Sequence, residues 1–126
     1  MSLTNYRALG GSGLIISPLA LGTMTFGDKT WGANIDAARS IFRAYTEAGG
    51  NFVDTADIYS GGISEEMTGQ FMVEMKLRDQ IVLATKFGFN GSSSPLSAER
   101  KKKEIQMPAA PVPKIFIAHL KVRCGD

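Results

Sequence analysis

The fold is decided by two stretches of sequence, residues 51–59, which read NFVDTADIY, and residues 81–86, which read IVLATK. Each contains a short apolar run with at least one β-branched residue, as a buried strand of a parallel sheet does. Each run leads to a charged residue, Asp54 in the first and Lys86 in the second. In α/β proteins, functional side chains gather at the carboxyl ends of parallel strands, so these two charges are the first candidates for a site.

An amphipathic segment precedes the first of these strands. Residues 36–48 predict a helix, because their apolar side chains recur at helical spacing. Asn34 or Asp36 can cap its start, and Gly49-Gly50 ends it. Its apolar face is expected to comprise Ile41, Phe42, Tyr45 and Ala48.

A second helix is predicted over residues 64–75, before the strand that ends at Lys86. Ser64 is the expected N-cap, and Glu65 and Glu66 in the first turn suit the helix dipole. We interpret the apolar stripe on one face as core rather than as a ligand site; it consists of Met67, Phe71 and Met75.

Residues 1–33 complete the pattern. Two apolar runs around a glycine-rich turn predict a β-hairpin over residues 6–17, and residues 19–22 predict a short strand. Residues 23–33 are rich in glycine, threonine and aromatic residues and are expected to form a loop. The resulting order, hairpin, strand, helix, strand, helix, strand, is typical of an α/β protein with a parallel sheet. It fits both the start of a closed barrel and an open doubly wound sheet.

If the two later strands are neighbours, about 4.8 Å apart, Asp54 and Lys86 emerge side by side and can form an ion pair. Tyr59 lies five residues after Asp54, so a short loop can return its phenol to the same place. A nearby ammonium favours the phenolate and lowers the pKa of a tyrosine from its usual value of about 10. Tyr59 could then act as a general acid toward a carbonyl oxygen, with Asp54 orienting Lys86. The alternative is an ordinary solvated ion pair. We refer to these three residues as the strand-end trio.

Composition excludes several classes of protein. The chain has 126 residues, of which 44% are hydrophobic, and no apolar run approaches the roughly 20 residues of a membrane span. Residues 1–5 lack the layout of a signal peptide. The single cysteine, Cys124, excludes an internal disulfide framework and favours a reducing compartment, so we expect a cytoplasmic protein. A net charge of +2 gives no reason to expect nucleic-acid binding.

The other motifs are weak. The turn at residues 10–13 reads GGSG and joins two strands, so it is not the dinucleotide-binding fingerprint. One histidine and one cysteine cannot build a metal site by themselves, and no metal is expected. Lys101–Lys103 could contact nucleic acid or anionic lipid, but no aromatic residues are interleaved with them, and we prefer a solvated helix face.

The composition changes near Pro95. Residues 1–95 contain 7 Lys and Arg against 9 Asp and Glu, a net charge of −2, whereas residues 96–126 contain 7 against 3, a net charge of +4. Thirteen of the 14 glycines lie at or before Gly91, and four of the five prolines lie at or after Pro95. We therefore divide the chain into residues 1–92 and a basic tail, residues 93–126.

The first 90 residues resemble the aldo-keto reductase family, and within it the branch of bacterial and fungal oxidoreductases. The matching segments are YRALGGSGL at residues 6–14, SPLALGTMTFG at 17–27, EAGGNFVDTADIYSGG at 47–62, SEE at 64–66 and LATKFGF at 83–89. The resemblance implies a (β/α)8 TIM barrel whose bottom is closed by an N-terminal hairpin. We therefore expect residues 1–92 to form an incomplete α/β fold, the hairpin plus the first three βα units of that barrel.

The resemblance also implies a function, the NADPH-dependent reduction of aldehydes and ketones to alcohols, with a small carbonyl compound as substrate. Asp54, Tyr59 and Lys86 match three members of the family's catalytic tetrad, with Tyr59 as proton donor. Gly22, Thr23 and Met24 match the loop after the first barrel strand. Together with Asp54, they are the expected contacts of the nicotinamide cofactor.

The fourth tetrad member of the family is a histidine at the end of the fourth strand. The only histidine here is His119, after an apolar run at residues 114–118, but the family's third helix is not recognisable between Gly91 and Lys114. We interpret His119 as a strand histidine without a site role. The tail is interpreted as the product of a truncated gene, a frameshifted reading frame or alternative splicing, because a complete barrel needs about 200 residues or more.

This interpretation leaves an alternative function open. A chain with three βα units is expected to bind cofactor weakly and to have impaired turnover. It would then be a non-catalytic fragment or pseudo-enzyme acting as an assembly partner. An exposed sheet edge would favour its self-association.

Overall fold

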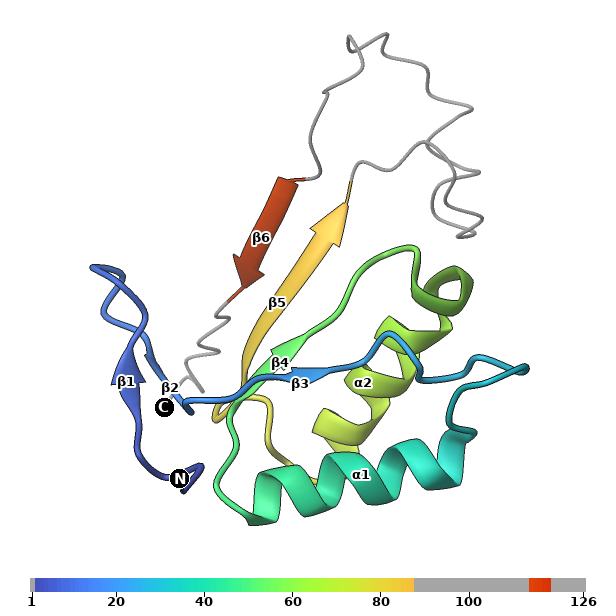
Figure 1. The fold of residues 1–126 in the computed structure, drawn as a ribbon, viewed down its shortest axis with the longest axis horizontal. Coiled ribbons are helices and arrows are strands. Elements are labelled where there is room, and N and C mark those ends of the chain that lie inside the picture. The colour runs from blue at the N-terminus through green and yellow to red at the C-terminus, as the bar shows by residue number, and fades with distance from the viewer. Residues whose placement is uncertain (1, 88–113, 119–126) are drawn as a thin grey trace, which may run out of the picture.

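The structure is a computed structural model that describes residues 2–87 and 114–118 (Figure 1). The domain boundary predicted at residue 92, Lys101–Lys103 and His119 lie outside the described residues. The elements in chain order are β1 (Arg7–Ala8), β2 (Ile15–Ile16), β3 (Leu21–Gly22), α1 (Ile35–Glu47), β4 (Phe52–Asp54), the 3-10 helix η1 (Tyr59–Gly62), α2 (Ile63–Glu74), β5 (Val82–Phe87) and β6 (Lys114–Ala118).

The centre of the fold is a sheet with the strand order β3-β4-β5-β6. β3, β4 and β5 are parallel, with Gly22 beside Asp54 and Asp54 beside Ala84. Both α1 and α2 cover the same side of this sheet (Figure 1). Right-handed crossovers place consecutive helices on one side both at the start of a barrel and in one half of a doubly wound sheet. The described strands by themselves therefore fit both architectures that the sequence pattern left open. They form an incomplete α/β fold that is not closed into a barrel, as predicted.

The core lies between the sheet and the two helices. Phe42 of α1, Phe71 of α2 and Val53 of β4 are all fully buried. The ring centroids of Phe42 and Phe71 are 5.7 Å apart, and Phe26, from the loop after β3, meets Phe71 at 6.3 Å. Aromatic pairs at these separations stabilise a core beyond the area that they bury.

The predicted apolar face is confirmed on the second helix and only in part on the first. Phe71 is buried, and Met67 and Met75 pack against the same cluster, so the stripe on the second helix is core as predicted. On α1, Phe42 is buried and Tyr45 contacts the cluster, but Ile41 is 44% exposed and Ala48 is exposed as well. Ile41 precedes Phe42 by one position and therefore lies about 100° around the helix, at the edge of the buried face.

One of the two predicted helix caps is wrong. Asn34 caps α1 as predicted, since its side-chain oxygen accepts from the N–H of Ala37 at 2.9 Å. At α2, the N-cap is Gly62, which has φ 100°, and Ser64 lies inside the first turn. Two glycines before the helix allow a left-handed backbone there, so the helix begins earlier than the Ser64 side chain would have started it.

The hairpin of β1 and β2 is a separate two-stranded sheet at the amino ends of the parallel strands. Asn51 attaches it, because its side-chain oxygen accepts from the N–H of Ser17 at 2.7 Å and its amide donates to the carbonyl of Ile15 at 2.9 Å. The hydroxyl of Tyr45 lies 2.8 Å from the carbonyl oxygens of Leu19 and Phe52. Tyr45 therefore links α1 to both β4 and the segment that leads into β3.

β6 runs antiparallel to β5, with Ala118 beside Leu83 and Lys114 beside Phe87. It pairs with one edge of β5, and β3 forms the other end of the sheet among the described residues. The carboxyl end of β6 therefore lies at the start of β5, at the edge opposite Lys86. Self-association through an exposed sheet edge stays a prediction.

Within residues 2–87 and 114–118, no helix has the length and apolar character that crossing a membrane requires. The same residues contain no group of three or more His, Cys, Asp and Glu side chains placed to hold a metal ion.

The Tyr45 hydroxyl predicts a measurable contribution to stability. Tyr45→Phe leaves the carbonyls of Leu19 and Phe52 without this partner, and we expect it to lower the free energy of unfolding by about 1–3 kcal/mol. Tyr6→Phe is the matched control, because Tyr6 is 47% exposed and its hydroxyl has one hydrogen bond among the described residues, to the carbonyl of Gly49. Urea denaturation of both variants measures the difference, and equal losses would contradict a special role for Tyr45.

Candidate active site

The carboxyl ends of β3, β4 and β5 meet at one edge of the sheet. Leu21, Val53 and Leu83 contact the core under the helices. Because side chains alternate along a strand, Asp54 and Lys86 project from the other face. Ala84 is the register partner of Asp54, and Lys86 lies two residues after Ala84. Lys86 and Asp54 therefore lie on the same face of the sheet. The two residues that the sequence places at strand ends are therefore brought to one place.

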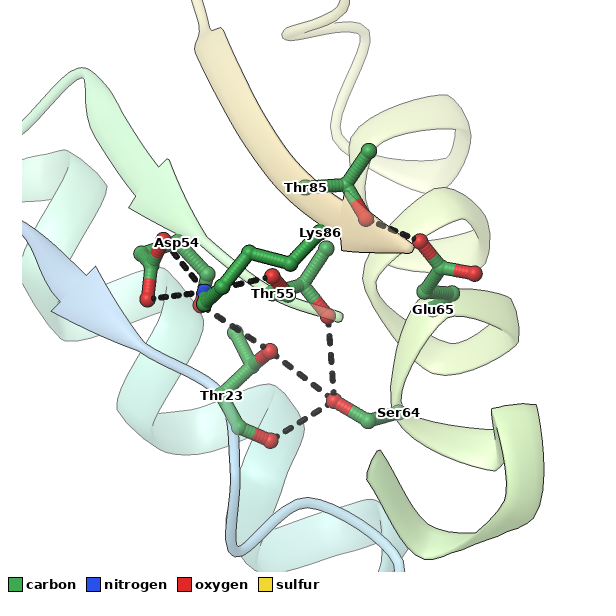
Figure 2. A network of polar contacts seen from close by, with 7 residues as sticks. All are labelled: Thr23, Asp54, Thr55, Ser64, Glu65, Thr85 and Lys86. Carbon is green, nitrogen blue, oxygen red and sulfur yellow. Dashed lines mark hydrogen bonds and ion pairs between the residues drawn. The ribbon is translucent and has the colours of Figure 1, made fainter. Parts of the chain in front are cut away.

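Lys86 and Asp54 form a close ion pair (Figure 2). The Lys86 ammonium donates to the Asp54 Oδ1 at 2.7 Å and Oδ2 at 2.8 Å, and also to the carbonyl oxygen of Thr55 at 2.8 Å. An ammonium has three protons and here has three acceptors. The lysine and aspartate side chains are only 26% and 38% exposed, so solvent screens the pair less than a surface pair.

The environment raises the pKa of Lys86 above its ordinary value of 10.5. Burial by itself lowers the pKa of the ammonium, but the hydrogen bond and charge of Asp54 outweigh it, and Tyr59 adds to the effect. The ammonium is thus the favoured form at neutral pH.

Tyr59 completes the strand-end trio, because the Lys86 ammonium lies 5.2 Å from the centre of its ring. The chain between β4 and Tyr59 is tied to β5, since the N–H of Asp57 donates to the carbonyl of Lys86 at 3.0 Å. Directly after Tyr59, Ser60 has φ 51°, an unusual left-handed conformation for a residue other than glycine. Its hydroxyl donates to the carbonyl of Phe26 at 2.8 Å, which holds the turn in place.

The three loop residues predicted to border a cofactor differ in exposure. Gly22 is exposed, and a Cβ atom built there would have no neighbour within 4 Å in the part of the chain that the structure describes. Met24 is 51% exposed. Thr23 is fully buried, and its hydroxyl donates to the carbonyl of Asp54 at 3.3 Å and accepts from Ser64 at 2.8 Å. Space for a ligand beside Asp54 therefore lies at Gly22 and Met24, while Thr23 faces the protein interior.

A polar network behind the trio was missed by sequence reasoning (Figure 2). The hydroxyl of Ser64 lies 2.6 Å from the carbonyl of Thr23, 2.8 Å from its hydroxyl and 3.4 Å from that of Thr55. The hydroxyl of Thr85 donates to the carboxylate of Glu65. The sequence feature that could have indicated this network is a threonine near the end of each parallel strand. We call these residues, Thr23, Thr55 and Thr85, the threonine row.

Comparison with known proteins agrees with this architecture. Residues 18–109 match the sequence model of the Aldo/keto reductase family. An aldo-keto reductase of Aspergillus calidoustus is 42% identical over 92 residues, which cover 68% of this chain and 23% of that protein. An aryl-alcohol dehydrogenase [NADP(+)] of Phanerodontia chrysosporium is 43% identical over 91 residues, which cover 68% of this chain and 24% of that protein.

A solved aldo-keto reductase of Bacillus halodurans superposes with a TM-score of 0.56 and 36% sequence identity, covering 66% of this chain and 26% of that chain. The match thus extends to the fold. The chain spans about a quarter of the length of these three proteins.

The Lys86 ion pair predicts a pH-dependent stability. The pKa of Lys86 is higher in the folded than in the unfolded state, so its stabilisation is complete below about pH 10 and is lost as the pH rises through the folded value. We expect Lys86→Met to cost about 1 kcal/mol at neutral pH, given the partial exposure of the pair. That cost should shrink at higher pH.

Urea denaturation of the protein and of Lys86→Met, from about pH 8 to about pH 11.5, tests this expectation. Lys29→Met is the control, because Lys29 is exposed and belongs to none of the ion pairs among the described residues. A cost of Lys86→Met that stays constant over this range would contradict the assignment.

Proposed function

Because the chain belongs to the aldo/keto reductase family, we propose that its strand-end trio serves an oxidoreductase that interconverts a small aldehyde or ketone and the corresponding alcohol. The observation that carries the proposal is the position of the Lys86 ammonium, which lies 2.7 Å from the Asp54 carboxylate and 5.2 Å from the centre of the Tyr59 ring. An ion pair and a phenol at the carboxyl ends of parallel strands form a suitable site for proton transfer.

Tyr59 is the proposed proton donor. In the reducing direction, its hydroxyl gives a proton to the carbonyl oxygen while the carbonyl carbon gains a hydride, so that an alcohol forms. The nearby Lys86 ammonium stabilises the negative charge that remains on the phenolate oxygen. Asp54 keeps the ammonium in place by accepting two of its protons. In the reverse direction the phenolate takes the proton back.

The residues beside Asp54 fit a nicotinamide cofactor. Gly22 has no side chain and, among residues 2–87 and 114–118, nothing lies where a side chain would stand. Met24 offers an exposed apolar side chain, so a flat ring can approach the edge of the sheet there. We propose that Gly22, Met24 and Asp54 border the ring and that Thr23, being buried, supports them from behind. When bound in its reduced form, the cofactor would supply the hydride.

NADPH is the proposed form of the cofactor, because the Phanerodontia chrysosporium relative carries NADP(+) in its name. The same name makes aryl alcohols and the matching aldehydes the first substrate class to try. We propose that the reaction takes place in the cytoplasm, which supplies NADPH and keeps a single cysteine reduced.

A second candidate, a non-catalytic assembly partner, is favoured by one observation. β6 lies antiparallel on β5, where the next strand of a barrel would run parallel, so its carboxyl end lies away from the trio. The described residues thus supply the trio but no group from a fourth parallel strand.

Tyr59→Phe tests the proposal. We expect this variant to bind NADPH as the unaltered protein does, but to reduce an aryl aldehyde about 10²- to 10⁴-fold more slowly, because it lacks the proton donor. The measurements are quenching of tryptophan fluorescence for binding and loss of nicotinamide absorbance for turnover. Tyr6→Phe is the control and should keep both properties, since Tyr6 lies in the hairpin segment.

Equal turnover by Tyr59→Phe and the unaltered protein would contradict the role of Tyr59. An unaltered protein that remains folded without measurable turnover would favour the assembly-partner candidate.

A further inference from the structure

The threonine row is aligned across the three parallel strands. Gly22, Asp54 and Ala84 are register partners, and each member of the row is the next residue along its strand. Backbone pairing continues into the row, since the N–H of Thr23 donates to the carbonyl of Asp54 at 3.0 Å and the N–H of Thr55 donates to the carbonyl of Ala84 at 2.8 Å. By alternation along the strands, the row faces the helices, whereas Asp54 and Lys86 face the other side.

The first turn of α2 contacts every member of this row. Ser64 is fully buried, and its hydroxyl lies within 3.4 Å of a polar atom of Thr23 and of the Thr55 hydroxyl. Glu65, the next residue, accepts from the hydroxyl of Thr85. Two adjacent residues of one helix therefore reach the ends of three strands (Figure 2).

Each threonine of the row is joined to a residue of the trio, either as its neighbour in the chain or by a hydrogen bond. Thr55 follows Asp54 in the chain, and its carbonyl accepts from the Lys86 ammonium. Thr85 precedes Lys86, and the Thr23 hydroxyl donates to the carbonyl of Asp54. Tyr59 begins η1, which leads directly into α2, so movement of the helix start would move the phenol as well.

We propose that Ser64 and Glu65 are positioning residues that hold the strand-end trio in register through the threonine row, an inference that rests on the function proposed above. Apolar side chains could attach α2 to the sheet, but dispersion contacts have no direction. Hydrogen bonds fix both distance and angle. A buried hydroxyl without a partner is costly, so the network is satisfied in one arrangement of the three strand ends.

The test uses Ser64→Ala and Thr85→Val, which each remove one hydroxyl of the network without adding volume. Thr68→Val is the matched control, because Thr68 is buried as Ser64 is and lies one turn further along α2. Its hydroxyl donates only to the carbonyl of Ser64 within the helix. Circular dichroism and thermal denaturation check that each full-length variant is folded.

The readout is the exchange of the Lys86 ammonium protons with water, followed by nitrogen-15 NMR and assigned by their absence in Lys86→Met. Three short hydrogen bonds should slow this exchange in the unaltered protein. We expect Ser64→Ala and Thr85→Val to accelerate it severalfold and Thr68→Val to leave it unchanged. This measurement needs neither cofactor nor turnover.

Acceleration in all three variants, or in none, overturns the positioning role. If Ser64→Ala fails to fold, the exchange rates of the Lys86 protons in Thr85→Val and in Thr68→Val are compared instead, and they test the same positioning role. Where the unaltered protein reduces an aldehyde, the first two variants should also lower kcat about tenfold and leave KM for the aldehyde unchanged. An unaltered protein without turnover contradicts the proposed function, while the exchange measurement still tests the network.

Discussion

The parallel register of β3, β4 and β5 is the constraint on which the rest of the structure depends. It places Gly22 beside Asp54 and Asp54 beside Ala84. A shift of one residue in any strand would turn its side chains to the opposite face, since the strand repeat is two. Asp54 or Lys86 would then face the aromatic core under the helices. The ion pair, the threonine row and the buried face are therefore consequences of one register.

Different interactions fix that register at the two ends of the strands. At the amino ends, Tyr45 and Asn51 bond to backbone groups of β4 and of the hairpin, so α1 and the hairpin are attached to the sheet by directional contacts. At the carboxyl ends, Ser64 bonds to the threonine row. Between them lies the core of Phe42, Phe71 and Val53, which contributes most of the burial but little direction.

The sequence predicted the elements well because their signals are local. The apolar runs that contain β4 and β5, the helical periodicity of α1 and the Asn34 cap all depend on residues close together in the chain. The strand-end trio was predicted for the same reason, since each member follows or ends a recognisable strand. The cap of α2 was predicted wrongly, because Ser64 is used in a contact with Thr23, 41 residues away.

The sequence by itself therefore determined which residues form strands and helices and which charges stand at strand ends. The side of the sheet that each helix covers was decided only in the tertiary structure, because a helical stripe does not specify which face it will cover. The same holds for the direction of β6, which follows from pairing with β5 across a distant segment. The inward bonds of Thr23 and Ser64 also arise only there, since a buried hydroxyl takes whichever partner the fold brings within reach.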